Sequence, residues 1–308
     1  MNILLTGGTG LVGSNIREYN EKNKNYNLLT PSHEEMDLLD RNAIVEFFEN
    51  NEFDYVIHAA GVVGGIHTNM ANLASFMHDN MVMGFNLLSV AQQFGIKNFL
   101  NFATSCMYPA DAVSPIAEEM ILNGKLHPSN EGYAIAKCAI AKYCEFIGGN
   151  YKTVIPCNLY GKYDKFHPDL SHMLPAAIRK VHLAKVNNDP VEIWGNGLAA
   201  REFMYAQDVA DFAFYALENM DDMPQYVNLG LEDDCTIREL YQAAANVIGY
   251  EGEFVYDESK PVGVLKKKCD ITKLESFGWK AKYTHEQGIK ETYDYFVKEY
   301  RENNSSEK

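Results

Sequence analysis

The chain has 308 residues and carries 42 acidic against 27 basic side chains, and the resulting formal net charge of −15 disfavours a nucleic-acid backbone as its partner. Hydrophobic residues make up 46% of it, which suffices for a substantial core, while no run approaches the roughly 20 apolar residues that a membrane span requires. Six cysteines show neither CxxC pairs nor metal-like spacing, and no signal segment precedes the first apolar run, so we expect a cytoplasmic protein without disulfides or bound metal.

Short apolar runs alternate with amphipathic segments in the first half of the chain. The apolar runs predict strands, and the segments between them, which have apolar residues at helical spacing, predict helices. We expect strands at 3–5, 28–30, 55–60, 99–104 and 153–158, and helices at 11–20, 41–51, 72–95 and 131–149. This alternation is typical of an α/β protein with a Rossmann-type, doubly wound parallel sheet.

The pattern changes after residue 161, where a loop rich in His, Pro and Asp begins. The elements predicted beyond it are a helix at 175–184, a strand at 191–194, a helix at 207–218, a strand at 225–229 and helices at 236–248 and 285–300. We therefore predict two domains. A nucleotide-binding domain would comprise 1–161 plus about 204–230, and a smaller C-terminal α+β substrate lobe would comprise about 162–203 and 231–308.

A glycine-rich turn joins the first predicted strand to the first predicted helix. In its GxxGxxG spacing, Gly7 permits a tight turn, Gly10 lets the backbone approach a pyrophosphate, and Gly13 allows close packing of the helix on the sheet. The helix N-terminus would then face the negative charge. A flexible turn is the alternative, but the position between strand and helix favours a dinucleotide site made by Gly7, Thr9, Gly10, Leu11, Val12 and Gly13.

The end of the second predicted strand bears on the choice of cofactor. An acidic residue there would accept hydrogen bonds from the ribose of NAD, and this chain has Thr30-Pro31-Ser32-His33 instead. Because no carboxylate repels a 2′-phosphate and Ser32 or His33 could donate to it, NADP(H) is the preferred cofactor. After the third strand, Ala59-Ala60-Gly61 offers a wall without bulky side chains for the adenine or ribose.

Tyr133 and Lys137 stand four residues apart in a predicted helix, so both lie on one face of it. An adjacent ammonium favours the ionised form of a phenol. We therefore expect Lys137 to lower the pKa of Tyr133 and to make it an acid/base for carbonyl reduction. The same spacing also occurs in ordinary surface helices.

Thr104 and Cys106 are two residues apart at the end of a predicted strand, so they would point to the same side if the extended conformation continued. Thr104 could then bind the oxygen of a substrate carbonyl while Tyr133 delivers a proton to it. Cys106 is either a small buried filler or a base that removes a proton α to the ketone.

Together with further segments, these residues resemble the extended short-chain dehydrogenase/reductases, and within them the GDP-L-fucose synthase family, over most of the chain. The resemblance rests on Gly7 to Gly13, Val63 to Ile66, Thr104 to Pro109, Asn130 to Lys137, Asn158 to Gly161, Phe166 to Pro168 with Ser171-His172, and Trp194 to Gly197 with Arg201 to Phe203. It implies NADPH-dependent reduction of the C4 ketone of a GDP-4-keto-6-deoxy sugar, together with 3,5-epimerisation.

The resemblance also implies roles for individual residues. The reductase triad would be Thr104, Tyr133 and Lys137, and the base and acid of epimerisation would be Cys106 and His172. Cofactor contacts outside the glycine-rich turn would also come from Lys137, Asn158, Tyr160 and His172. The side chains lining a GDP-sugar pocket would be Lys180, Trp194, Arg201 and Lys267. A homodimer through helices 72–95 and 131–149 is implied as well, although their apolar stripes could equally be internal core.

The chain departs from the family near the expected substrate. Lys180 and Lys266 stand where Arg is usual, Val262 stands where Asp is common, and Thr9 stands where Arg is often found. Since Lys lacks the bidentate fork that grips phosphate, these changes leave open whether the sugar is a hexose or a heptose. The alternatives are a C4-reductase of a GDP-4-keto-heptose or 6-deoxyheptose without epimerisation, a sugar-nucleotide 4-epimerase or dehydratase that retains NAD, and a redox-sensing regulator that binds NADP(H).

Overall fold

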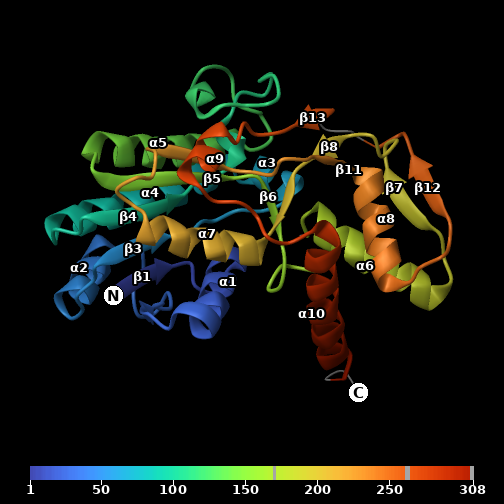
Figure 1. Cartoon of the computed structure of the whole chain (residues 1–308), viewed down its shortest axis with the longest axis horizontal. Helices are drawn as coiled ribbons and strands as arrows, with labels where there is room; N and C mark the ends of the chain where they lie inside the picture. Colours follow the sequence, from blue (N-terminus) through green and yellow to red (C-terminus); the bar gives the residue numbers. More distant parts are fainter. Residues whose placement is uncertain (169–170, 261–263, 306–308) are drawn as a thin grey trace.

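A parallel sheet lies at the centre of the larger part of the molecule (Figure 1). The computed structural model describes residues 1–168, 171–260 and 264–305. The strands of this sheet are β1 (Asn2–Thr6), β2 (Asn27–Leu29), β3 (Tyr55–His58), β4 (Asn98–Phe102), β5 (Asn150–Pro156) and β10 (Tyr226–Leu229). Their order is β10-β5-β4-β3-β1-β2, and every pairing is parallel. The predicted Rossmann-type sheet is confirmed, and its winding reverses at β1 and β3, where such sheets bind ligands.

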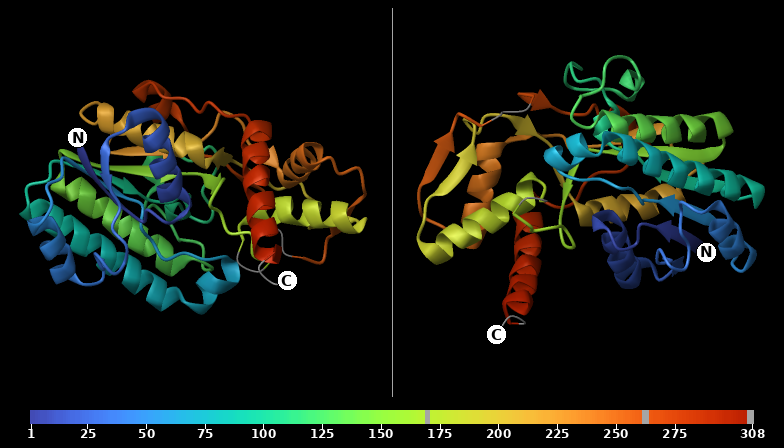
Figure 2. Two further views of the ribbon diagram at one scale, coloured as in Figure 1. Left: turned by 90° about the horizontal axis from the view of Figure 1, so that it is seen from below. Right: turned by 180° about the vertical axis from the view of Figure 1, so that it is seen from behind.

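Helices cover both faces of this sheet (Figure 2). On one face α1 (Leu11–Tyr19), prolonged by the π-helical turn η1 (Asn20–Lys24), packs with α7 (Ala206–Glu218). The helices of the other face are α2 (Arg41–Glu49), α4 (Leu73–Gln93) and α5 (Glu131–Ile147). In β1, Ile3 and Leu5 pack in the core on the side of α1 and α7, and Leu4 packs in the core on the side of α2 and α4. Because successive side chains of a strand point to opposite faces, a strand covered on both sides must be continuously apolar.

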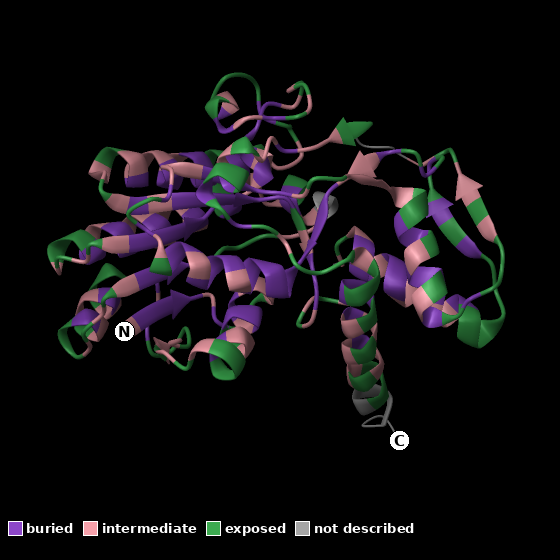
Figure 3. Ribbon diagram, in the orientation of Figure 1, coloured by how far each residue is buried: buried purple, intermediate pink, exposed green. Residues whose placement is uncertain are grey.

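The smaller part has a separate core. Three helices, α6 (Met173–Asn187), α8 (Ile237–Ile248) and α10 (His285–Ser305), enclose it together with the parallel pair β7 (Val191–Trp194) and β12 (Phe254–Asp257). Its buried residues include Ile178, Leu240 and Phe296. Figure 3 shows this second band of buried residues apart from the buried central sheet.

Short strands connect the two parts. β6 (Asn158–Tyr160) pairs with β9 (Phe203–Tyr205), and a small sheet has the order β11-β8-β13. Its strands are β11 (Cys235–Thr236), β8 (Ala200–Arg201) and β13 (Lys266–Lys267). The remaining elements are α3 (Ile66–Ala71), η2 (Ser105–Met107), η3 (Glu118–Met120) and α9 (Thr272–Phe277).

Every predicted helix and strand is present close to its expected position, while several short elements, among them β9, β12 and α9, were not predicted. Other differences lie at the ends of elements. The strand expected at 99–104 ends at Phe102, because the chain turns into η2 at Ser105. Leu274 and Phe277 of α9 pack into the core of the larger part, although their positions fall within the range predicted for the smaller lobe. No helix within the described ranges combines the length and the apolar character needed to cross a membrane.

Candidate active site

The glycine-rich turn forms a backbone cradle at the carboxyl end of β1. Gly7 has a φ of +76°, and a Cβ added to it would lie 2.7 Å from the backbone nitrogen of Ala60. A Cβ on Gly13 would lie 2.1 Å from the carbonyl oxygen of Gly7. Gly10 caps α1 without a side-chain hydrogen bond, so the cap leaves the first-turn N–H groups directed outward. A pyrophosphate fits such a cradle, because only glycines allow the turn to lie this close to Ala60.

The end of β2 differs from the sequence-based expectation. The N–H of Ser32 donates to a carboxylate oxygen of Glu35 at 2.7 Å, and the N–H of Glu35 donates to the Ser32 hydroxyl at 3.3 Å. The His33 ring lies 3.8 Å from the carboxylate of Asp37. The carboxylate of Glu35 therefore lies beside Ser32, although the residues at the strand end itself include no acidic side chain.

Tyr133 and Lys137 lie in the first half of α5, beside the ends of two strands. The Lys137 ammonium is buried and donates to the carbonyl oxygens of Phe102 at 3.0 Å and Ala60 at 3.4 Å. It lies 5.9 Å from the centroid of the Tyr133 ring. A Cβ added to Gly61 would lie 3.5 Å from the same ammonium, so the predicted ribose wall and the predicted catalytic helix do adjoin. Two of the three ammonium protons are engaged, which leaves one for a ligand.

The expected lowering of the Tyr133 pKa by Lys137 is wrong for this geometry. Burial raises the pKa of Tyr133, and the nearby Cys106 thiol raises it further. Burial also lowers the pKa of Lys137 to about 8. Desolvation of the phenolate by burial is the larger effect, and the Lys137 ammonium donates to the carbonyl groups of Phe102 and Ala60. A phenol that stays protonated at neutral pH is nevertheless the form that a proton donor requires.

Thr104 and Cys106 are brought together by a turn and not by strand alternation. Thr104 is extended and caps η2, and its hydroxyl oxygen accepts a hydrogen bond from the Cys106 N–H at 3.2 Å. The Thr104 hydroxyl keeps its own proton available for a substrate oxygen. η2, which carries Cys106, packs against α5, which carries Tyr133.

His172 caps the N-terminus of α6 at the end of the loop that follows β6. Its side chain is exposed, yet the protein atoms around its ring and the charge of Lys165 lower its pKa. The same loop holds Asp164, which the sequence analysis missed. Burial raises the pKa of Asp164 to about 7, and its Oδ2 atom has no hydrogen-bond partner among the described residues. No spacing or motif indicates this carboxyl group, because its burial depends on how the loop folds.

The predicted substrate-binding residues form two groups. The Lys180 ammonium lies 5.3 Å from the ring centroid of Trp194, and the Lys260 ammonium lies 5.7 Å from the same centroid. Trp194 is 52% exposed. Arg201 and Lys267 are register partners in β8 and β13. The Lys267 ammonium donates to the carbonyl oxygen of Ser105 at 2.9 Å, which ties the second group to the loop of Thr104 and Cys106.

Two departures from the family fall near these groups. Lys266 forms an ion pair with Asp234 at 3.1 Å. Val262 lies outside the described residues.

Asn158 and Tyr160 are the two cofactor candidates on β6, and only Asn158 is accessible. Its side-chain amide donates to the carbonyl oxygen of Glu202 at 2.9 Å, and the residue is exposed. Tyr160 is 1% exposed and belongs to the core of the smaller part, where its ring packs against Tyr205. The Tyr160 ring is therefore enclosed by the core, and a cofactor contact of this residue stays a prediction that its backbone would have to make.

A buried histidine lies beneath this site. Nδ1 of His58, at the end of β3, and the hydroxyl of Thr6 share a hydrogen bond of 2.9 Å. Burial, followed by the charge of Lys137, lowers the pKa of His58 to about 3. The folded protein thus holds this ring neutral at pH values where an unfolded chain would protonate it.

We expect this histidine to make stability fall in acid. Its folded pKa is below the ordinary value of 6.5, so its contribution is complete above about pH 6.5 and declines as the pH falls toward 3. Between about pH 7.5 and about pH 5.5 the loss is about 1.4 kcal/mol. Urea unfolding of the protein and of His58→Gln at both values measures it. The other histidines titrate in both proteins, and equal losses in the two would contradict the assignment to His58.

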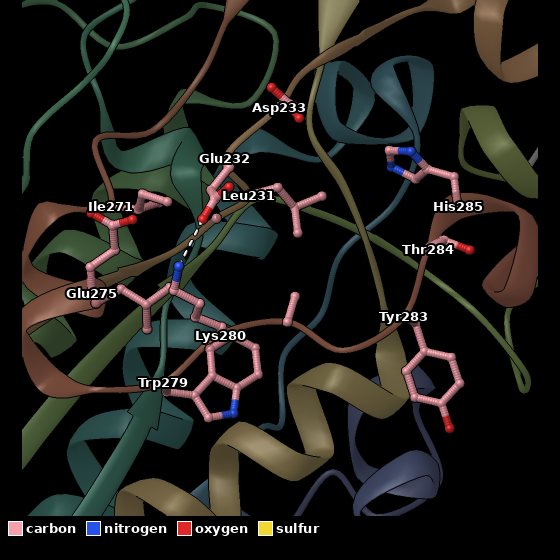
Figure 4. A pocket seen from close by; sticks show the side chains of 13 residues that line it. Leu231, Glu232, Asp233, Ile271, Glu275, Trp279, Lys280, Tyr283, Thr284 and His285 are labelled. Atoms are coloured by element: carbon pink, nitrogen blue, oxygen red, sulfur yellow. Dashed lines mark hydrogen bonds and ion pairs between the residues drawn. The ribbon is translucent and has the colours of Figure 1, made fainter.

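Two cavities in the described part of the chain are lined by none of these residues. One of about 360 Å³ lies between the segments that connect the two parts, and Figure 4 shows Lys280 paired with Glu232 beside it while Tyr283 and His285 line another side. None of the predicted site residues lines it. The candidate site is instead the place where α5 meets η2 and, through Ala60, the glycine-rich turn.

Comparison with known proteins agrees with this geometry. A model of the NAD dependent epimerase/dehydratase family matches residues 3–230. A GDP-L-colitose synthase of Yersinia pseudotuberculosis is 50% identical over 305 residues, covering 97% of this chain and 99% of its own. The GDP-L-fucose synthase of Escherichia coli is 40% identical over 308 residues, covering 96% of each.

Solved structures give the same picture. A GDP-mannoheptose C4 reductase from Campylobacter jejuni with NADP bound is similar at a TM-score of 0.87 and 30% identity, covering 96% of this chain and 98% of its own. A GDP-D-glycero-L-gluco-heptose synthase from the same organism, in the presence of NADPH, is similar at a TM-score of 0.90 and 29% identity, with the same coverage.

Proposed function

The chain belongs to the NAD dependent epimerase/dehydratase family, and on this premise we propose that it reduces the C4 ketone of a GDP-4-keto-6-deoxy sugar with NADPH and epimerises the carbons beside that ketone. The observation that carries the proposal is the packing of η2, which carries Cys106, on the helix α5 that holds Tyr133 beside Lys137. Relatives named as GDP-L-colitose and GDP-L-fucose synthases, similar over nearly the whole chain, support it.

The residues around the candidate site suit NADP(H). The N–H groups of the glycine-rich turn would hold its pyrophosphate, and the spare proton of Lys137 would bind the ribose near Gly61. When bound, this cofactor supplies a hydride to the ketone carbon. A GDP-mannoheptose C4 reductase similar to this chain has NADP bound, which supports the same cofactor here.

In the proposed reduction, the protein supplies the proton and fixes the ketone. The protonated phenol of Tyr133 donates to the C4 oxygen, and the Thr104 hydroxyl donates a second hydrogen bond to it. The Lys137 ammonium then lies near the tyrosinate that forms and stabilises its charge until a proton returns from solvent.

In the proposed epimerisation, Cys106 and His172 act at carbons whose protons the ketone makes acidic. The thiolate of Cys106 removes a proton from one face, and His172 returns a proton to the other. The hydrogen-bond donors at the C4 oxygen stabilise the enolate between these steps, so one set of donors serves both reactions.

The GDP-sugar would extend from this point into the smaller part. Arg201 and Lys267, on paired strands, are the cations that we assign to the diphosphate, and Lys267 already reaches the carbonyl of Ser105. Lys180 and Trp194 would receive the distal part of the nucleotide sugar. We accordingly propose that the larger part binds the cofactor and that the smaller part binds the GDP-sugar.

A second candidate is C4 reduction alone, on a GDP-4-keto-heptose. The similarity to a GDP-mannoheptose C4 reductase favours it, and the Lys180 and Val262 departures are compatible with a different sugar. The 50% identity to a colitose synthase is higher than the 30% identity to this reductase, so the first proposal stands ahead.

Incubation with NADPH and a panel of GDP-4-keto hexoses and heptoses in D₂O tests the proposal. We expect NADPH to be oxidised with a 6-deoxyhexose substrate and NMR to show deuterium at the carbons beside C4, because epimerisation exchanges their protons with solvent. Reduction without deuterium would favour the second candidate. Failure of every sugar to oxidise NADPH would contradict both.

We also propose that the protein is a cytoplasmic homodimer, joined through α4 and α5. These helices leave Phe146 81% exposed and Met77 and Ile135 each 37% exposed on the outer side of their layer, although both helices pack on the sheet. A second copy would cover these side chains. Sedimentation velocity measures this directly, since a dimer has twice the chain mass of 34.8 kDa.

A further inference from the structure

Arg17, on the outer side of α1, lies where the glycine-rich turn meets the end of β2. Its Nη1 donates to the carbonyl oxygen of Gly8 over 3.5 Å, and the Ser14 hydroxyl donates to the same oxygen at 3.3 Å. A Cβ added to Gly8 would lie 2.9 Å from Cβ of Thr30 and 3.6 Å from Cδ of Arg17. The Arg17 stem, the turn and Thr30 are therefore neighbours, although the sequence places Arg17 on a helix and Thr30 after a strand.

This corner is the place where a Rossmann fold holds the adenosine ribose, and its charge decides whether a 2′-phosphate is accepted. The two residues expected from the sequence to donate to it each lie beside a carboxylate. The Ser32 N–H donates to the Glu35 carboxylate, the Ser32 hydroxyl oxygen accepts from the Glu35 N–H, and His33 faces Asp37. Hydrogen bonds from Ser32 lower the pKa of Glu35, so its carboxylate stays charged. A 2′-phosphate here needs a cation that outweighs this carboxylate.

We propose that Arg17 is the residue that recognises the 2′-phosphate of NADP(H), and that Glu35 opposes it. This inference rests on the proposed use of a nicotinamide dinucleotide. Arg17 is exposed, and its guanidinium has five N–H donors, of which one contacts Gly8. The others can form the bidentate, charge-assisted bonds that a phosphate accepts.

The anchoring contact distinguishes Arg17 from an ordinary solvated arginine. Bonding to the Gly8 carbonyl directs the side chain along the glycine-rich turn, beside Thr30, and not into solvent. Ser14 shares that carbonyl from the preceding turn of the same helix face. The phosphate-binding group is thus partly ordered before the cofactor arrives, which reduces the entropy lost on binding.

Dissociation constants for NADPH and NADH, measured by calorimetry without any sugar, test the proposal. In Arg17→Gln we expect NADPH binding to weaken by roughly 10- to 100-fold while NADH binding changes by less than about twofold, because only NADPH carries the 2′-phosphate. Glu35→Gln should tighten NADPH binding severalfold. Arg41→Gln is the matched control, since Arg41 is an exposed helix arginine that bonds Gln93 far from the turn.

Each outcome supports or overturns the assignment. Equal weakening of both cofactors in Arg17→Gln would show that Arg17 only supports the turn at Gly8, and unchanged NADPH binding would exclude it as the phosphate ligand. Unchanged or weaker NADPH binding in Glu35→Gln would overturn the opposing role of Glu35. Thermal unfolding of each variant checks that the fold is kept. If NADPH binds as expected but no GDP-keto sugar is reduced, the proposed function fails and the role of Arg17 stands.

Discussion

Replacing Tyr133 with Phe is expected to lower kcat for NADPH oxidation by about 10³-fold, within the range found when a positioned proton donor is lost. The change removes one oxygen and keeps the ring beside Lys137, so packing in α5 should persist. Steady-state loss of NADPH absorbance with the GDP-keto sugar measures kcat. Calorimetry should show unchanged NADPH affinity, because the ribose contact assigned to the candidate site comes from Lys137.

Tyr143→Phe is the matched control for this substitution. Tyr143 lies on the same helix, but its ring contacts Phe85 and its hydroxyl donates to Gln92, so it is turned toward α4. We expect that variant to retain nearly full activity. A Tyr133→Phe enzyme that keeps more than about a tenth of the wild-type kcat would show that the proton comes from elsewhere.

The pH dependence of kcat/KM should identify which group limits activity in alkali. Because burial raises the pKa of Tyr133, the phenol stays a donor well above neutral pH. Lys137 is cationic only below its pKa of about 8, so the charge that stabilises the tyrosinate is lost as the pH rises through that value. We therefore expect kcat/KM to decline above about pH 8, and a profile that stays flat there would contradict the assigned role of Lys137.

Replacing Cys106 with Ser is expected to abolish most of the epimerisation while leaving reduction. A serine hydroxyl is a far weaker base than a thiolate at neutral pH, so deuterium uptake beside C4 in D₂O should fall by about 10²-fold or more. The Thr104 hydroxyl and the Tyr133 phenol remain, and the unepimerised ketone should still be reduced. NMR of the product gives both its configuration and its deuterium content.

Cys235→Ser serves as the control for Cys106→Ser. Both cysteines are partly exposed, but Cys235 lies 3.3 Å from His285 in the smaller part, and burial raises its pKa to about 11. It should leave both reactions unchanged. If Cys106→Ser alters neither deuterium uptake nor product configuration, the protein does not epimerise through this thiol, and C4 reduction alone becomes the better account.

Local sequence patterns predicted the fold well because each reports on a few neighbouring residues. The period of apolar residues in β1 and α5 indicates which faces need covering, and the glycine spacing indicates a turn that only glycine permits. Tyr133 and Lys137 were found in the same way, since four residues in a helix return to one face. The fold class and the helix that carries Tyr133 and Lys137 could therefore be predicted from spacing, whereas the roles of the other site residues came from the family resemblance.

The errors share a physical cause, which is that burial and long-range contacts set chemical behaviour. The spacing placed Lys137 beside Tyr133, but its ammonium bonds the carbonyl of Ala60, 77 residues away, and desolvation decides the Tyr133 pKa. Strand alternation was extended to Cys106, although the chain had already turned at Ser105. No pattern indicated that the Tyr160 ring lies in the core.

The sequence by itself determined the alternation of strands and helices, the glycine-rich turn and the helix that carries Tyr133 and Lys137, since all of these are encoded within about one element. Only the tertiary structure decided which distant groups meet. It brought Arg17 to Thr30, Glu35 to Ser32, and Lys267 to Ser105 across 162 residues. These long-range contacts, and the desolvation that accompanies them, depend on how whole elements pack. A local pattern of side chains does not contain information on that packing.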